Sequence, residues 1–322
     1  MSLLDRYRGA LLGLAIGDAL GSTVEFNRPG TFPPVSDLVG GGQFNLKPGE
    51  WTDDTSMALC LAESLTERVG FDAKDQVERY CRWYETGYLS VNGRCFDIGI
   101  TVRSALVAYR RTGNPFSGPI SPRTAGNGSL MRLAAIPLFF AASPRQAIHY
   151  AGESSRTTHG TQAAVDACRY FAGLIVGALQ QRSKSDLLTP YFFPGGEPDF
   201  WRDYPLDPTI AGIAGGSFKN KQPPQIKATG YVVDSMEAAL WAFHRSDSFS
   251  EGALLAVNLG DDADTTGAIF GQLAGAFYGA EQVPEQWLNK LAWREFIIEK
   301  ADQLFRLSEE QQALAGGQEK AS

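Results

Sequence analysis

Apolar residues recur at intervals of three and four positions along most of the chain, which is the spacing that places them on one face of a helix. Segments that alternate between apolar and polar residues, as a half-buried strand does, are scarce. The pattern therefore predicts an all-α protein, and because no charge run or change of composition divides the chain, we expect a single domain. The predicted helices span residues 3–20, 54–68, 73–86, 98–111, 129–141, 160–181, 231–245, 249–257, 265–279 and 284–307.

Two long connections rich in glycine and proline interrupt this helical pattern. They cover residues 26–51 and roughly 186–229, and both contain aromatic side chains. Connections of this length in a compact domain are usually either functional or disordered. The aromatic content favours order, so we expect both to be ordered loops near a functional site.

Two of the predicted helices, the first and the one over residues 265–279, carry glycine at every fourth position and therefore along one face. A glycine inside a helix costs about 1 kcal/mol relative to alanine, and close approach of two backbones is the expected compensation. If the two helices cross antiparallel, the end of the first, which carries Asp18 and leads to Glu25, meets the start of the second. The glycines are Gly9, Gly13, Gly17, Gly21, Gly267, Gly271, Gly275 and Gly279.

Acidic residues cluster at two predicted helix starts that are far apart in the chain. The segments are WTDDTS, residues 51–56, and GDDADTT, residues 260–266. Aspartate and threonine are good N-caps, which is the simpler interpretation. The same oxygen ligands, with no histidine or cysteine nearby, suit Mg2+, Mn2+ or Ca2+. Converging carboxylates about 5 Å apart repel by roughly 3 kcal/mol per pair, so the segments either stay apart as caps or converge around cations.

Charge and cysteine content narrow the class of protein. The formal net charge is -7, which argues against general nucleic-acid binding. Cys60, Cys81, Cys95 and Cys168 form neither a C-x-x-C pair nor a zinc-type cluster, which favours buried thiols in a reducing compartment. Asp18 interrupts the apolar N-terminal stretch before it reaches the length of a membrane span, and the start of the chain lacks a signal-peptide pattern. We therefore expect a cytoplasmic protein without a membrane partner, and a monomer.

Four segments together resemble the ADP-ribosylglycohydrolase family, and most of all its bacterial branch typified by dinitrogenase-reductase-activating glycohydrolase. They are GLAIGDALGSTVEF, KPGEWTDDTSMAL, AGNGSLMR and NLGDDADTTGAIFGQLAGAFYG. The resemblance implies a compact orthogonal helix bundle over residues 1–314, with a flexible tail over 315–322. It also implies two divalent cations, Mg2+ or Mn2+, in a central cleft. The expected reaction removes ADP-ribose from a modified side chain of a protein substrate and releases free ADP-ribose; arginine is the expected side chain.

The resemblance also assigns roles to individual residues. Glu25 matches the catalytic glutamate, our choice of general base, and Asp97 matches an aspartate of the arginine-specific branch, expected to contact a guanidinium group. Ile100 stands where this branch has asparagine, so that segment matches less well, and Asp261 falls outside the D-x-D-T ligand pattern. The implied metal ligands are Thr52, Asp53, Asp54, Asp262, Asp264 and Thr265. The implied substrate contacts are Gly99, Gly126, Asn127, Gly128, His159 and Tyr231.

The residues alone leave simpler roles open for several of these positions. Asp97 also suits the cap of the helix over 98–111, and the segment AGNGSLMR suits a turn before a helix. A lone histidine or tyrosine, such as His159 or Tyr231, is commonly structural. Arg123 and Arg132 are expected to be solvated at the surface rather than to hold phosphate.

Other functions also fit parts of the pattern. A hydrolase of ADP-ribosyl-serine or O-acetyl-ADP-ribose needs similar ligands, and so does a two-metal hydrolase of phosphate esters. A non-catalytic protein on the same fold is the third alternative, since structural lens proteins resemble the family. The complete set of aspartate and threonine ligands, together with Glu25, argues against this last alternative.

Overall fold

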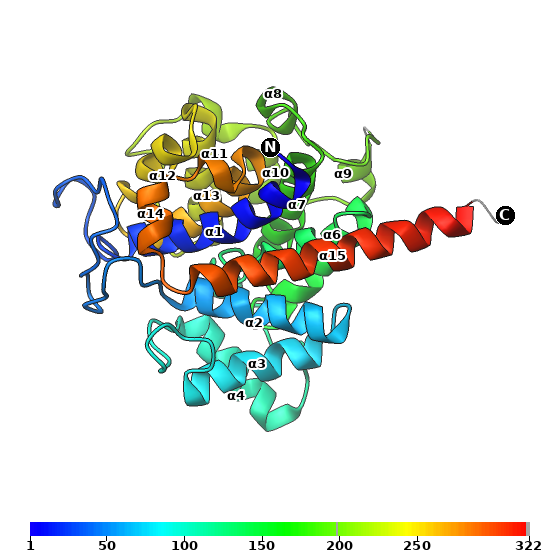
Figure 1. The fold of residues 1–322 in the computed structure, drawn as a ribbon, viewed down its shortest axis with the longest axis horizontal. Helices are drawn as coiled ribbons and strands as arrows, with labels where there is room; N and C mark the ends of the chain where they lie inside the picture. Colours follow the sequence, from blue (N-terminus) through cyan, green and yellow to red (C-terminus); the bar gives the residue numbers. More distant parts are fainter. Residues whose placement is uncertain (198, 320–322) are drawn as a thin grey trace.

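The computed structural model describes residues 1–197 and 199–319, and these form an all-helical domain (Figure 1). The described residues contain 15 α-helices and no strand, which confirms the predicted all-α class, although only ten helices were predicted. Their only extended pairing is two isolated bridges. The helices are α1 (Leu3–Gly21), α2 (Asp53–Arg68), α3 (Ala73–Thr86), α4 (Ile100–Thr112), α5 (Ala135–Phe139), α6 (Pro144–Arg156), α7 (Gln162–Leu179), α8 (Lys184–Leu187), α9 (Phe200–Asp203), α10 (Pro208–Ala214), α11 (Val232–Arg245), α12 (Phe249–Val257), α13 (Ala263–Tyr278), α14 (Glu285–Lys290) and α15 (Arg294–Glu319).

Helices α1 and α13 pack against each other at the centre of the domain (Figure 1). A β-carbon on Gly13 would lie 2.3 Å from the carbonyl oxygen of Gly271, and one on Gly17 would lie 2.0 Å from that of Gly267. Such distances are far shorter than a van der Waals contact, so only glycine fits. This confirms the expected close backbone approach. The glycine pairs run in opposite directions along the two helices, so the condition of an antiparallel crossing is met.

The other helices surround this central pair. Helices α2, α3 and α4 form the lower part of Figure 1 and enclose their own apolar cluster, which includes Met57, Tyr80 and Trp83. Helices α7, α11 and α12 cover α13, and the long helix α15 lies across α1 and α2. No helix in the described part of the chain has the length and hydropathy to cross a membrane. Of the expected tail over 315–322, residues 320–322 lie outside the described residues, and α15 extends to Glu319.

Two predicted helices differ from the structure, and one helix of the structure was not predicted. Only α5 forms within 129–141, where the preceding residues make consecutive turns. Helix α6 was not predicted, although Ser143 accepts the backbone N–H of Gln146 as an N-cap and Pro144 stands at the first turn, a recognisable helix start. The helix predicted over 284–307 is interrupted between α14 and α15, because the backbone of Ala292 binds Gly49 and the indole of Trp51 instead of its own helix.

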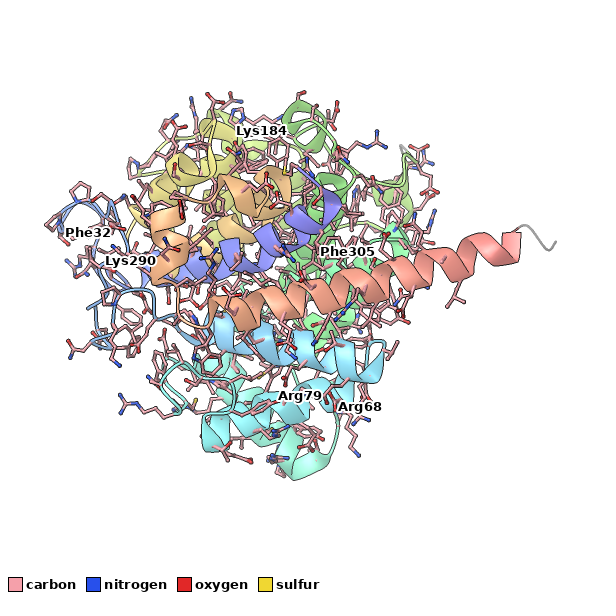
Figure 2. All side chains as sticks on the ribbon, viewed as in Figure 1. Phe32, Arg68, Arg79, Lys184, Lys290 and Phe305 are labelled. Atoms are coloured by element: carbon pink, nitrogen blue, oxygen red, sulfur yellow. The ribbon has the colours of Figure 1, made fainter. Side chains whose placement is uncertain are left out.

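The connection over residues 26–51 is held against the domain by two contacts. The Lys290 ammonium of α14 lies 2.6 Å from Asp37 Oδ2, and Figure 2 shows Lys290 beside this loop. The Phe32 ring, at the outer edge of the same view, packs against Gly260, where a β-carbon would lie 2.8 Å from the ring. The loop therefore abuts the start of the second acidic segment. The connection over 186–229 carries short helices, and of its described residues only Thr229, at its end, reaches the cavity described below.

Candidate metal centre and active site

The α1–α13 crossing brings the two acidic segments together. A β-carbon on Gly21 would lie 2.3 Å from the backbone nitrogen of Asp264, so the end of α1 touches the first turn of α13. Helix α2 begins at the same place, because the Thr52 hydroxyl lies 3.2 Å from Asp54 Oδ2 and 3.2 Å from Asp264 Oδ2. Two segments more than half the chain apart thus form one cluster of oxygen atoms.

Two groups of carboxylate oxygens in this cluster have the spacing of a metal site. Oxygens of Asp18, Asp54 and Asp264 all lie within 4.8 Å of one another, and so do oxygens of Glu25, Asp262 and Asp264. Asp264 belongs to both groups and lies between them. Of the six ligands expected from the sequence, Thr52, Asp54, Asp262 and Asp264 meet here, whereas Asp53 and Thr265 lie in the wall of the adjoining cavity.

The helix-cap interpretation of the acidic segments does not match their geometry. Thr52 and Asp262 do occupy the N-cap positions of α2 and α13, yet neither side chain makes a cap hydrogen bond. The Thr52 hydroxyl contacts carboxylates, and Asp262 accepts a hydrogen bond of 2.7 Å from the Asn127 amide. Asp261 is half-buried, and its backbone binds that of Asn27 and Phe26. These side chains are therefore available to a ligand rather than to the helix termini.

Asp18 is a residue of the site that the sequence reasoning placed nearby but did not include among the ligands. It is fully buried in α1 and accepts four hydrogen bonds, from the backbone N–H and hydroxyl of both Thr52 and Thr55, at 2.6 to 3.0 Å. It thereby fixes the first turn of α2 against α1. The sequence signal is the position itself, because a lone carboxylate stands between Gly17 and Gly21 on a helix that is otherwise apolar there.

The electrostatics of the cluster favour bound cations. Burial, and then the neighbouring carboxylates, raise the pKa of Glu25 to about 10 and hold the pKa values of Asp54 and Asp264 well above the usual range. Buried oxygens of the same three residues, Glu25 Oε2, Asp54 Oδ1 and Asp264 Oδ1, have no hydrogen-bond partner. Anionic oxygens that lack protein donors are the ligands of hard divalent cations, so the residues present fit a cation of this class.

The metal should therefore stabilise the protein more strongly as the pH rises. Because the folded-state pKa values of Asp54, Asp264 and Glu25 are raised, the metal-free folded protein holds more protons than the unfolded chain, and its free energy of unfolding falls as pH rises from about 5 to about 8. Bound cations would replace these protons. We expect the increase in Tm on adding millimolar Mg2+ to be larger at about pH 8 than at about pH 5. A Tm increase that is equal at both pH values, or that sodium chloride reproduces, would contradict this.

A cavity of about 1010 Å³ opens beside the cluster. Glu25, Asp53, Asp97, Asp262 and Asp264 line its acidic side, and the segment 126–128 lines another part of the wall. A volume of this size accommodates a ligand larger than a simple sugar. The cavity therefore combines space for a nucleotide-sized group with a cluster of carboxylates.

Asp97 belongs to the cavity and does not cap α4. The N-cap of α4 is Gly99, with no side-chain cap bond, whereas Asp97 has a left-handed φ of 62°. Burial and the neighbouring Asp262 raise the pKa of Asp97 to about 8. Gly99 also lines the cavity, and Ile100, which replaces the expected asparagine, is 85% exposed at its rim. A left-handed aspartate at a carboxylate cluster is a backbone conformation typical of functional sites.

Most of the expected substrate contacts line the cavity, but Tyr231 does not. Gly126, Asn127, Gly128 and His159 line the cavity, and the Asn127 amide is directed at Asp262 rather than at the open space. Tyr231 pairs with Gly126 through its backbone, is 40% exposed, and is not among the residues that line the cavity.

The expectation for Arg132 is wrong, whereas Arg123 is exposed as expected. Arg132 has an exposed fraction of 0%, and its guanidinium donates to the carbonyl of Gly128 at 2.9 Å and to the hydroxyl of Thr158 at 2.7 Å. The arginine therefore supports the cavity wall from within the protein. Three of the four cysteines are buried and none forms a disulfide, as predicted, while Cys95 is half-buried in the cavity wall.

Comparison with known proteins identifies the family. The ADP-ribosylglycohydrolase profile matches residues 1–314. The chain is 45% identical to ADP-ribosylarginine hydrolase Tri1 of Pseudomonas putida, over 94% of this chain and 78% of the relative, and 41% identical to Tri1 of Serratia proteamaculans, over 96% and 81%. The ADP-ribosyl-[dinitrogen reductase] glycohydrolase of Rhodospirillum rubrum, from the branch named above, is less similar, at 33% identity over 90% and 91%.

A solved structure agrees with this assignment. The chain superposes on an ADP-ribosylglycohydrolase-related protein complex with a TM-score of 0.83 and 44% identity, covering 95% of this chain and 99% of the other. Profile, relatives and structure thus match nearly the whole chain, including both acidic segments. The protein belongs to the ADP-ribosylglycohydrolase family.

Proposed function

We propose that the protein is an ADP-ribosylarginine hydrolase, which cleaves the N-glycosidic bond between ribose C1 of an ADP-ribosyl group and the guanidinium of an arginine side chain. The observation that carries the proposal is the placement of Glu25 and Asp97 on one cavity, next to a cluster of metal-type oxygens. The relatives named ADP-ribosylarginine hydrolase Tri1, at 45% and 41% identity, support arginine as the linkage. An ADP-ribosylated protein would be the substrate, and free ADP-ribose the product.

The metal ligands follow from the oxygen cluster. Two divalent cations, Mg2+ or Mn2+, would supply positive charge that polarises the ribose hydroxyls and a water and holds them in place. The residues that would hold the cations are Thr52, Asp53, Asp54, Asp262, Asp264 and Thr265. Asp18 acts through Thr52. It accepts a hydrogen bond from the Thr52 hydroxyl, so that the lone pairs of the hydroxyl oxygen are directed at the cluster.

Glu25 is the general base of the proposed mechanism. Its Oε2 is buried without a hydrogen-bond partner and faces the cluster, so it has the capacity to take a proton. The pKa of this carboxyl is raised by burial and by neighbouring carboxylates, and nearby positive charge would return it to the ionised form. The water oxygen then forms a bond to C1 as the C1–N bond breaks, and Glu25 takes the water proton. The electron pair of the C1–N bond stays on the nitrogen of the released guanidine, which takes up one proton in place of the one that Glu25 gives back, so that arginine and the Glu25 carboxylate are both restored. Positive charge develops on the ribose during this step, and the carboxylate also stabilises it.

Asp97 is proposed to bind the leaving group. A carboxylate and a guanidinium form a charge-assisted pair, often through two parallel hydrogen bonds. This pair would hold the arginine at the part of the cavity wall that Asp97 shares with Glu25. Serine has no such group, so Asp97 contributes to the choice of linkage.

The test of linkage is a hydrolysis panel with ADP-ribosyl-arginine, ADP-ribosyl-serine and O-acetyl-ADP-ribose. We expect free ADP-ribose from the arginine conjugate only, and Asp97→Asn should lower kcat/KM for this substrate by about 100-fold or more. Chromatography of the products gives both results. Asp261→Asn is the matched control, because Asp261 lines the same cavity outside the proposed ligand set, and it should stay close to wild type. Faster hydrolysis of the serine conjugate, or release of phosphate or a nucleoside monophosphate, would contradict the proposal.

A further inference from the structure

A buried arginine lies directly behind the cavity wall. The Arg132 guanidinium stacks 4.5 Å from the centre of the Tyr80 ring. Its described hydrogen bonds reach only uncharged groups: the Gly128 carbonyl, the hydroxyls of Thr157 and Thr158, and the Met57 sulfur. Burial of a cation is costly unless hydrogen bonds or a negative charge compensate it. The positive charge of Arg132 is therefore available to a negative charge that enters the cavity.

The Thr158 hydroxyl lies between Arg132 and His159, and its contact with Arg132 determines which way its hydrogen bond to His159 runs. Arginine only donates, so at 2.7 Å the Thr158 oxygen accepts from Arg132. The same oxygen lies 2.9 Å from His159 Nδ1. These two contacts are the hydrogen bonds described for this hydroxyl, and Thr158 is fully buried. Its single proton is satisfied if it points at Nδ1, whereas the opposite arrangement leaves a buried hydroxyl proton without an acceptor.

An Nδ1 that accepts a hydrogen bond determines the tautomer of a neutral histidine. The proton must then reside on Nε2. Burial and the charge of Arg132 lower the pKa of His159 to about 3, which keeps the ring neutral at physiological pH. The Nε2 edge faces the segment 126–128: a β-carbon on Gly126 would lie 3.3 Å from Nε2, and one on Gly128 would lie 2.9 Å from Cε1. The two glycines thus make room for the ring edge at the cavity.

We propose that Arg132 and Thr158 are positioning residues that hold His159 as the Nε2–H tautomer, so that this nitrogen donates a hydrogen bond to an oxygen of the bound ADP-ribosyl group. The charge of Arg132 behind the ring favours an anionic acceptor, so the expected partner is a diphosphate oxygen. The identity of the ligand rests on the proposed function, whereas the tautomer does not. The cavity wall therefore presents a donor whose direction is fixed before the ligand binds.

The tautomer is measured directly by 15N NMR of the imidazole rings in the full-length protein. The chain has only three histidines, so substitution of His149 and of His244 assigns the signals. We expect His159 in the wild-type protein to show a protonated Nε2 and an unprotonated Nδ1. In Thr158→Val, the 15N chemical shifts of both ring nitrogens should move toward intermediate values, because the hydrogen bond that keeps Nδ1 unprotonated is lost. Thr158→Ser retains the hydroxyl and should restore the wild-type spectrum.

Binding of ADP-ribose in the presence of Mg2+, measured by calorimetry, gives the second readout. Thr158→Val should weaken the affinity by about three- to tenfold, the effect of one hydrogen bond, and Thr158→Ser should remain near wild type. A wild-type His159 protonated on Nδ1, or a Thr158→Val variant with unchanged spectrum and affinity, would overturn the inference. Failure of the wild-type protein to bind ADP-ribose would overturn the proposed function instead, and the NMR result would still decide the tautomer.

Discussion

Replacing Asp264 by asparagine is expected to abolish hydrolysis of ADP-ribosyl-arginine, with kcat/KM reduced by about 1,000-fold or more. Asp264 is the carboxylate shared by both groups of converging oxygens, and its Oδ2 lies 3.2 Å from the Thr52 hydroxyl. Asparagine keeps the shape but removes the charge and one anionic ligand, and metal centres contribute several kcal/mol to such reactions. Calorimetry should show that the variant binds Mn2+ much more weakly.

The same substitution should leave the metal-free protein folded and at least as stable as the wild type. Burial, then Glu25 and Asp54, hold the pKa of Asp264 well above its usual range, so a neutral side chain relieves repulsion in the empty cluster. Thermal unfolding without metal therefore separates loss of function from loss of structure. Asp261→Asn, a substitution of the same kind in the same segment, should retain both metal binding and activity. Unchanged Mn2+ affinity in Asp264→Asn, or full activity of EDTA-treated wild-type enzyme, would refute the two-metal mechanism.

Much of the site could be predicted because its chemistry is concentrated in short segments. WTDDTS and GDDADTT each contain the ligand types of a hard-cation site, and the structure brings them together. The structural roles of Asp18 and Arg132 could not be predicted in the same way. Both are single charged residues whose role depends on burial, and burial is decided by which helices cross. Arg132 is flanked by Met131 and Leu133, but this apolar setting does not show which groups the buried guanidinium binds.

The fold shows the same division between local and long-range information. The glycine spacing in α1 and α13 is local, and it was enough to predict close backbone approach, but it left open whether the two helices cross each other. The break between α14 and α15 is not local, because Ala292 leaves the helix to bind Gly49 and Trp51, residues from the other end of the chain. A periodic apolar pattern continues through such a break and therefore does not reveal it.

Replacing Gly271 by alanine is expected to cause a large loss of stability for so conservative a change. A β-carbon at this position would lie 1.9 Å from the carbonyl oxygen of Gly13 and 2.4 Å from its carbonyl carbon. Both are backbone atoms of a buried helix, so no side chain is able to move aside, and α1 and α13 must separate. Alanine gains about 1 kcal/mol in helix propensity. We expect the overlap to outweigh this gain and to lower the free energy of unfolding by at least about 4 kcal/mol, measured by denaturant titration.

Gly212→Ala is the matched control for this prediction. Gly212 also lies within a helix, α10, but a β-carbon there would meet no atom within 4 Å, so alanine should leave stability unchanged or raise it by up to about 1 kcal/mol. If Gly271→Ala were as stable as this control, the helices would not be in backbone contact. Separation of α1 and α13 should also weaken Mg2+ binding in any Gly271→Ala protein that remains folded. The close contact of these two helices, which glycine permits, is what places Asp18 next to Asp264. Packing and metal affinity would then fall together, as expected if the glycine faces exist to bring those two helix ends into contact.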